Sequence, residues 1–127
     1  MARVARLRSR KLFAQVLRRG RALGSRHLVL FWLAEDSEPL QVGFAVQRAV
    51  GSAVRRNRVR RRLRALAEAT RESLPARGYM VWLGKHTALD APWEELLATA
   101  RRLVGRVRAL SEAAESAADQ PGEEKGR

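Results

Sequence analysis

Apolar residues change their spacing several times along the chain, and each change predicts an element. After Ser9, apolar residues recur at i, i+1, i+4 and i+5, which predicts a helix that is capped by Ser9 and ends near Gly20. The nearly continuous apolar run at 27–34 predicts a strand buried on both faces, whereas residues 40–47 alternate strictly in the manner of a strand. We expect these two strands to form a hairpin around the acidic turn at 35–39.

The second half of the chain repeats the succession of helix and strand. Residues 53–73 keep apolar positions at helical spacing behind a cap at Ser52. Residues 79–84 predict a third clear strand, residues 93–110 carry the most regular helical stripe, and residues 20–25 leave room for a short fourth strand. The expected fold is a two-layer α/β (α+β) sandwich in the order α-β-β-(β)-α-β-α, with a central, mainly antiparallel sheet.

The two ends of the chain differ in character from its middle. Residues 1–8 are expected to form a loose basic arm, and residues 9–110 a single domain, which suits a chain of 127 residues. Residues 111–127 hold five acidic and two basic residues without an apolar period, which predicts a disordered acidic tail. The formal charge of that tail is −3, and the whole chain has a formal net charge of +13, so residues 1–110 together carry +16.

A charge this large on about a hundred residues repels itself, and it is favourable chiefly beside a polyanion. Nucleic acid is therefore the expected partner. An anionic membrane surface is the second candidate, disfavoured because no apolar run approaches the ~20 residues of a spanning helix. The absence of cysteine excludes disulfides and thiolate metal sites. The basic N-terminus lacks the apolar region of a secretory signal, so we expect a cytoplasmic protein.

The charge is concentrated in one run, because seven of the ten residues from Arg55 to Arg64 are arginine and none is acidic. If Val59 and Leu63 face the core, Asn57 and Arg64 fall on the opposite side of the helix. Like charges at i, i+3 and i+4 each cost about a few tenths of a kcal/mol, which argues against a merely solvated helix. A guanidinium binds phosphate bidentately and stacks on bases, and an asparagine both donates and accepts. Arginine density alone does not choose between RNA and DNA.

A resemblance to the bacterial ribonuclease P protein subunit lies in the run Val50-Gly-Ser-Ala-Val-Arg-Arg-Asn-Arg-Val-Arg-Arg-Arg-Leu-Arg64. The family signature is Val-Gly-Asn-Ala-Val followed by an Arg-Asn-Arg core, so Ser52 replaces its usual asparagine. The stretch from Phe13 to Gly20 resembles the family's Phe-x-x-Val-x-x-x-Gly pattern in its first helix. The resemblance covers roughly residues 6–110.

The resemblance implies a subunit of a ribonucleoprotein whose catalytic RNA removes the 5′ leader of precursor tRNA by metal-assisted phosphodiester hydrolysis. It implies a ribosomal protein S5 domain 2-like fold with a left-handed βαβ crossover, and Mg²⁺ acting through the RNA. No catalytic residue, bound cofactor or further protein partner is expected for the chain, and the sequence identifies no metal ligand. The residues expected to bind the catalytic RNA are Arg48, Arg55, Arg56, Asn57, Arg58, Arg60, Arg61 and Arg64. Those expected to bind the leader are Phe13, Leu17, Phe31 and Arg48.

Alternatives remain open for several residues and for the function. Phe13 lies on the apolar stripe of its helix and suits core packing as well as leader contact. Phe31 and Trp32 are neighbours on a strand, so one faces the core and the other the leader cleft or a helix. Trp82 and Trp93 are expected in the core. The other functional classes are a structural RNA-binding protein of ribosomal type without a cleavage role and a basic DNA-compacting protein.

Overall fold

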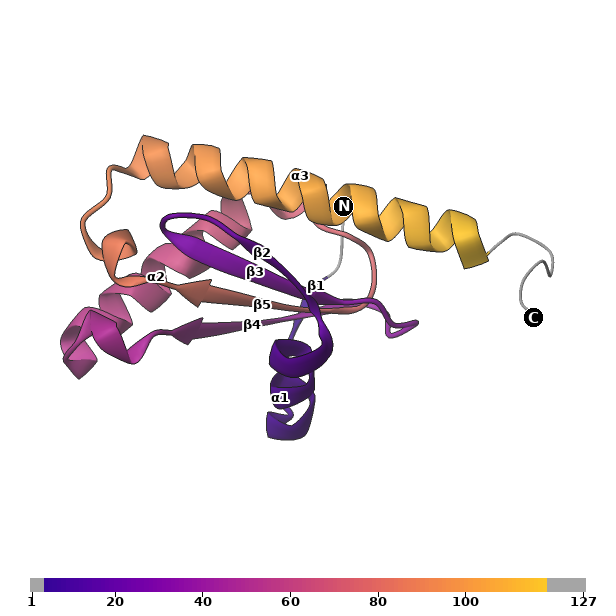
Figure 1. Ribbon diagram of the computed structural model, residues 1–127, viewed down its shortest axis with the longest axis horizontal. Helices are drawn as coiled ribbons and strands as arrows, with labels where there is room; N and C mark the ends of the chain where they lie inside the picture. The colour runs from indigo at the N-terminus through magenta and orange to yellow at the C-terminus, as the bar shows by residue number, and fades with distance from the viewer. Residues whose placement is uncertain (1–3, 119–127) are drawn as a thin grey trace.

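The computed structural model describes residues 4–118, which form a five-stranded sheet with helices on both faces (Figure 1). The strands are β1 (Val4–Arg6), β2 (Arg21–Gly24), β3 (Leu28–Leu33), β4 (Leu40–Val46) and β5 (Tyr79–Gly84). The α-helices are α1 (Arg10–Arg19), α2 (Ala53–Ala69) and α3 (Trp93–Ala118). Three short 3-10 helices connect them: η1 (Arg48–Val50), η2 (Arg71–Ser73) and η3 (His86–Leu89).

The central strand of the sheet is β5, in the order β1-β4-β5-β3-β2. It pairs parallel with β4 and antiparallel with β3, so the predicted hairpin of β3 and β4 is wrong. The physical reason is burial: Met80 and Trp82 fill one side of β5 and Val81 the other, which favours a central position. The remaining pairs are β1 with β4, parallel, and β2 with β3, antiparallel. The sheet is therefore evenly mixed and not mainly antiparallel.

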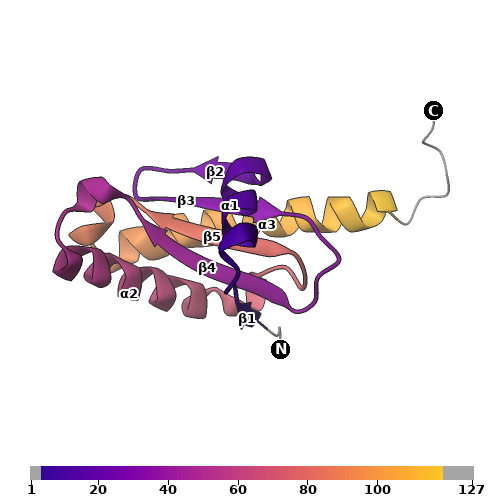
Figure 2. The same ribbon diagram turned by 90° about the horizontal axis from the view of Figure 1, so that it is seen from below.

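The two faces of the sheet carry different helices. On one face α2 and α3 enclose the main core, while α1 crosses the other face (Figures 1 and 2). The buried residues beneath α1 are Leu7, Val16 and Val81. The predicted mixed α/β class is confirmed. The two-layer description fits the sheet with α2 and α3, and α1 adds a short third element. Helix α2 connects the parallel neighbours β4 and β5, and the left-handed sense of this crossover stays a prediction.

The predicted loose arm at residues 1–8 needs correction for its described part. Val4 pairs with Leu40 and Arg6 with Val42, which makes β1 a parallel edge strand. The pairing continues where the Leu7 amide donates to the Val42 carbonyl at 3.0 Å, and Leu7 is buried. The outer edge of β4 offers unpaired backbone groups, and three residues of β1 satisfy them. Residues 1–3 lie outside the described part of the chain.

The predicted disordered tail also needs correction, because α3 continues through residues 111–118. Alanine and glutamate dominate this stretch and favour a helix even without an apolar stripe. Arg108 supports the extension through an ion pair with Glu112, with 3.1 Å between Nε and Oε2. Residues 119–127 lie outside the described part. Even with this length, none of the helices within residues 4–118 is apolar enough to cross a membrane.

Two glycines let a helix approach the sheet closely, one on each face. A Cβ at Gly84 would lie 2.5 Å from Val59 Cγ1 of α2. A Cβ at Gly43 would lie 2.7 Å from Cε2 of the Phe13 ring on α1. Both distances are shorter than carbon atoms tolerate, since optimal contacts lie near 3.5–4.0 Å. The absence of a side chain at these two positions therefore determines how closely α1 and α2 pack on the sheet.

Candidate nucleic-acid interface

The arginine-rich helix α2 follows β4 after η1 and a turn at Gly51 and Ser52. Gly51 has φ of +114°, a conformation that favours glycine. Ser52 is the N-cap, as predicted, and its hydroxyl oxygen accepts from the Arg55 amide at 3.3 Å. The Arg56 guanidinium also donates to the Gly51 carbonyl at 2.7 Å. The start of α2 is therefore fixed to the end of the sheet by both backbone and side-chain contacts.

One side of α2 is fully buried, and this determines where its charges lie. Val59, Leu63 and Leu66 have no exposed surface, in agreement with the helical spacing in the sequence. The rest of the helix surface, with Asn57, Arg61 and Arg64 opposite the buried side, carries the predicted RNA-binding residues of the helix, which we name the arginine face: Arg55, Arg56, Asn57, Arg58, Arg60, Arg61 and Arg64. Within residues 4–118, no arginine between 55 and 64 forms an ion pair. The arginine face is thus a cationic surface that none of the carboxylates among residues 4–118 neutralises.

Contacts within the arginine face hold several of its side chains in place. The Arg60 guanidinium donates to Asn57 Oδ1 at 2.9 Å. The guanidinium carbon of Arg64 lies 5.7 Å from the centre of the Phe44 ring, within cation–π range. Each contact restricts a long side chain before any partner arrives, which lowers the entropy cost of binding.

Arg62 is part of the same run but has a different role, which the sequence did not reveal. Its guanidinium donates to the carbonyl oxygens of Ala88, Leu89 and Ala91 at 2.7–3.1 Å. These bonds satisfy the end of η3 and the segment leading into α3. On the helix, position 62 falls on the flank that faces α3, and this was the one available signal. Arg62 therefore stabilises the fold by joining α2 to a distant segment, whereas in the described part of the chain the side-chain hydrogen bonds of the other arginines in the run span at most five residues of the sequence.

The residues predicted to bind the leader fall into two groups. Phe13 of α1 and Phe31 of β3 lie in one partly buried apolar cluster, which also contains Tyr79. Leu17 is 39% exposed one turn further along α1. Arg48 is exposed on η1, next to the start of α2 and apart from that cluster in sequence and element. Phe13 therefore packs against the sheet, and leader contact by these residues stays a prediction.

The tryptophans clarify which sides of the strands are structural. Trp32 faces the main core, so its neighbour Phe31 faces α1, as the alternation of a strand requires. Trp82 is fully buried, as predicted. Trp93 is 36% exposed, so its predicted core position is wrong. It is the first residue of α3, where fewer neighbouring turns are present to cover a side chain.

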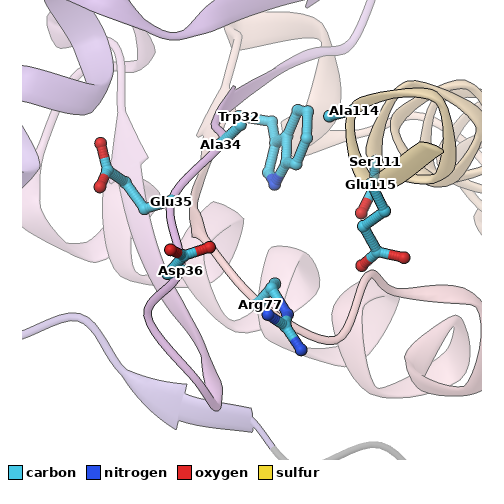
Figure 3. A pocket seen from close by; sticks show the side chains of 8 residues that line it. All are labelled: Trp32, Ala34, Glu35, Asp36, Arg77, Ser111, Ala114 and Glu115. Carbon is cyan, nitrogen blue, oxygen red and sulfur yellow. The ribbon is translucent and has the colours of Figure 1, made fainter. Parts of the chain in front are cut away.

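A second charged region lies at the end of the molecule away from the start of α2 (Figure 1). There a cavity of about 640 Å³ opens between α3 and the loop after β3, with Glu35 and Asp36 on one side and Glu115 on the other. Figure 3 shows Arg77 and the Trp32 indole between these carboxylates. Three carboxylates against one guanidinium disfavour a phosphate. Across residues 4–118 no three His, Cys, Asp or Glu side chains come together as a metal site.

Comparison with known proteins identifies the family. Residues 1–108 match the family model described as Ribonuclease P. The chain belongs to the Ribonuclease P family. The Ribonuclease P protein component of Acidothermus cellulolyticus is 42% identical over 104 residues, which are 80% of this chain and 87% of that relative. The Ribonuclease P protein component of Nocardioides sp. is 42% identical over 105 residues, 80% of this chain and 90% of the relative.

Solved structures of Ribonuclease P proteins share the fold. The protein from Thermotoga maritima superposes with a TM-score of 0.70 at 21% identity, over 80% of this chain and 96% of that one. The protein from Staphylococcus aureus gives 0.65 at 15% identity, over 87% and 97%. In this Ribonuclease P family member the Arg-Asn-Arg core, Arg56 to Arg58, occupies the first turns of α2.

Proposed function

We propose that this chain is the protein subunit of ribonuclease P, which binds the catalytic RNA and the 5′ leader of precursor tRNA. In this role it promotes endonucleolytic removal of the leader, which generates the mature 5′ end of the tRNA. The protein supplies binding and position, and the catalytic centre lies in the RNA. Mg²⁺ acts through that RNA and not through ligands of this chain.

The observation that carries this proposal is the arginine face on α2, which forms no ion pair with any carboxylate of the described residues, in a chain of this family. Guanidinium groups bind phosphate oxygens bidentately, and each phosphate neutralised releases condensed counterions. A folded, pre-oriented array of such groups favours a structured polyanion. The catalytic RNA is a structured polyanion of this kind, and in this proposal it binds to the arginine face. A structural RNA-binding protein without a cleavage role is not favoured by the family match.

We assign the leader to the other face of the sheet, where Phe13 and Phe31 lie in one apolar cluster and α1 also carries the exposed Leu17. An unpaired strand stacks its bases on aromatic rings, with about 1–3 kcal/mol per base. Arg48 is exposed on η1, next to the start of α2, so in this proposal it would neutralise a phosphate of the RNA that the arginine face binds. This arrangement would let one small domain hold the catalytic RNA and the leader together.

Reconstitution tests the function directly. Purified protein is added to the cognate RNA subunit and precursor tRNA at low Mg²⁺, and cleavage of the leader is measured. We expect strong stimulation, since phosphate neutralisation by the protein lessens the need for divalent ions. Tighter binding of precursor than of mature tRNA is expected from a leader site. An absence of stimulation would reject the cleavage role and leave the structural RNA-binding alternative.

A variant of the arginine face locates the RNA surface. Replacing Arg56, Asn57 and Arg58 by alanine should weaken binding to the cognate RNA. It should also flatten the salt dependence of binding by about 0.7–0.9 for each phosphate that is no longer neutralised. The matched control replaces the exposed Arg101 and Arg102 of α3, which removes the same charge from another surface. Equal losses of affinity in both variants would mean that net charge, and not the arginine face, determines binding.

A further inference from the structure

A hollow of about 250 Å³ lies where the C-terminal half of α2 passes the β1 edge of the sheet. Figure 2 shows β1 beside this end of α2. Strand β1 supplies one wall, β4 the floor and α2 the other wall. The lining residues are Val4, Ala5, Arg6, Val42, Phe44, Arg64, Ala67, Glu68, Arg71 and Leu74.

The floor of the hollow is apolar and flat. Phe44 is half-buried, and its ring stands 6.5 Å from the ring of the fully buried Trp82, centre to centre. Above it lies the Arg64 guanidinium, 5.7 Å from the ring centre. Ala67 opens the wall on the α2 side, because its methyl group leaves space that a larger side chain would fill. Planar groups thus follow one another from the core to the surface, and the outermost one remains open to a partner.

The rim of the hollow is cationic, with one carboxylate. Arg6, Arg64 and Arg71 contribute three guanidinium groups, and Glu68 contributes an acceptor that lies 3.3 Å from the Arg71 guanidinium nitrogen. A flat apolar floor favours a planar ring, guanidinium groups favour a phosphate, and a carboxylate accepts from an amino group. An unpaired nucleotide combines a ring, a phosphate and, in most bases, an exocyclic amino group. A basic peptide would be repelled by the three arginines.

The hollow is continuous with the arginine face. Arg56, Arg60, Arg64 and Ala67 follow one another at i, i+4, i+8 and i+11, so they lie along one flank of α2. That flank runs toward β1, and the opposite flank carries Arg62 against η3. An RNA backbone that follows this row of guanidinium groups therefore arrives at the hollow.

We infer that the hollow takes one unpaired, outward-turned nucleobase of the RNA bound on the arginine face. The base would stack on the Arg64 guanidinium that covers Phe44, with its phosphate near Arg6 and its amino edge toward Glu68. This inference rests on the proposed function. It adds a site that reads a single unpaired nucleotide to a surface that otherwise neutralises phosphates.

The test fills the hollow without altering charge. Ala67→Leu places a branched side chain inside it, and Ala65→Leu makes the same change at an exposed position of the same helix. Both residues are good helix formers, so the two variants differ chiefly in the hollow. Binding of the cognate catalytic RNA and chemical reactivity of each of its nucleotides are measured with both variants and the parent chain. We expect Ala67→Leu to weaken binding about 5- to 100-fold and to restore reactivity at one unpaired nucleotide, and Ala65→Leu to change neither.

The outcomes separate this inference from the proposed function. If the parent chain binds the RNA and Ala67→Leu gives the same affinity and the same protections, the nucleobase site is rejected and the proposed function stands. If the parent chain neither binds the RNA nor stimulates cleavage, the proposed function is rejected, and the nucleobase site, which rests on it, is rejected with it.

A second pair of variants covers the case in which Ala67→Leu does not fold. Arg6→Gln removes a rim charge and should reduce the salt slope of binding by about 0.7–0.9. Arg8→Gln, at an exposed position two residues on and outside the hollow, should leave the slope unchanged. Equal slopes for these two variants would also reject the site.

Discussion

The two faces of the sheet are built from similar residues but are closed to different degrees. Beneath α2 and α3 the core is complete, with Leu30, Leu63 and Trp82 fully buried. Beneath α1 only a small cluster is buried, and Phe13 and Phe31 are partly exposed at its margin. A complete core contributes stability to the fold. Aromatic rings that are only half covered still have exposed apolar surface, which a partner could bury on binding. The difference indicates that the α2 and α3 face holds the fold together and offers a partner the outer surface of α2, whereas the α1 face still has apolar surface of the sheet itself available to a partner.

The largest effect on stability should come from a substitution that creates a cavity in the main core. Leu63→Ala removes a fully buried side chain of α2 and should lower the free energy of unfolding by about 2–5 kcal/mol. The same substitution at Leu17 of α1, which is 39% exposed, should change it by less than about 0.5 kcal/mol. Urea unfolding of both variants measures this. Similar losses would show that α1 is as structural as α2.

The next effect separates two neighbouring arginines of α2. Arg62→Gln loses hydrogen bonds to three carbonyls and should cost about 1.5–3 kcal/mol of stability. Arg61→Gln should leave stability nearly unchanged and reduce the salt slope of RNA binding by about 0.7–0.9. Urea unfolding and RNA titrations at several salt concentrations measure the two quantities. A reversed pattern would assign the partner-binding role to Arg62.

A smaller effect compares the two close approaches of helix to sheet. Gly84→Ala should destabilise the protein by about 1–3 kcal/mol, because the branched Val59 side chain has no room to retreat. Gly43→Ala should cost less, since the Phe13 ring is only partly buried and can swing outward. Thermal unfolding gives the comparison. A larger loss for Gly43→Ala would mean that the α1 face is packed as rigidly as the core.

The smallest effect on stability is expected from Phe13→Leu, which keeps an apolar side chain of similar volume and should cost less than about 1.5 kcal/mol. Its effect should appear in binding, because leucine offers no ring for stacking. The preference for precursor over mature tRNA should fall, while affinity for mature tRNA, which has no leader, stays constant. An unchanged preference would remove Phe13 from the leader site and leave it a packing residue.

The elements with a long apolar period could be predicted from the sequence. These include α2 with its Ser52 cap and the buried β5, because local spacing and tertiary packing agree there. The neighbours of each strand could not be predicted. Strand β1 is three residues long, too short for a period, and it exists because the β4 edge needs a partner. The extension of α3 past residue 110 depends on helix propensity, which an apolar pattern does not report.

The arginine face could be predicted because a run of arginines with no acidic residue among them can be recognised from the sequence alone. The role of Arg62 could not, since its three acceptors lie 26 to 29 residues away in sequence. The hollow beside β1 could not be predicted either. It lies between α2, which the sequence predicted, and β1, which it did not.

The central strand of the sheet is also the last one to be synthesised, and this affects how the protein is made. While a growing chain stops short of residue 79, β3 and β4 have no common partner, and each exposes an open edge. The β2–β3 hairpin and α2 can form from local contacts. The five-stranded sheet is complete only when β5 pairs with β4 on one side and β3 on the other. Arg55 to Arg64 leave the ribosome before that moment. The nascent chain therefore presents its RNA-attracting residues before it has the fold that positions them.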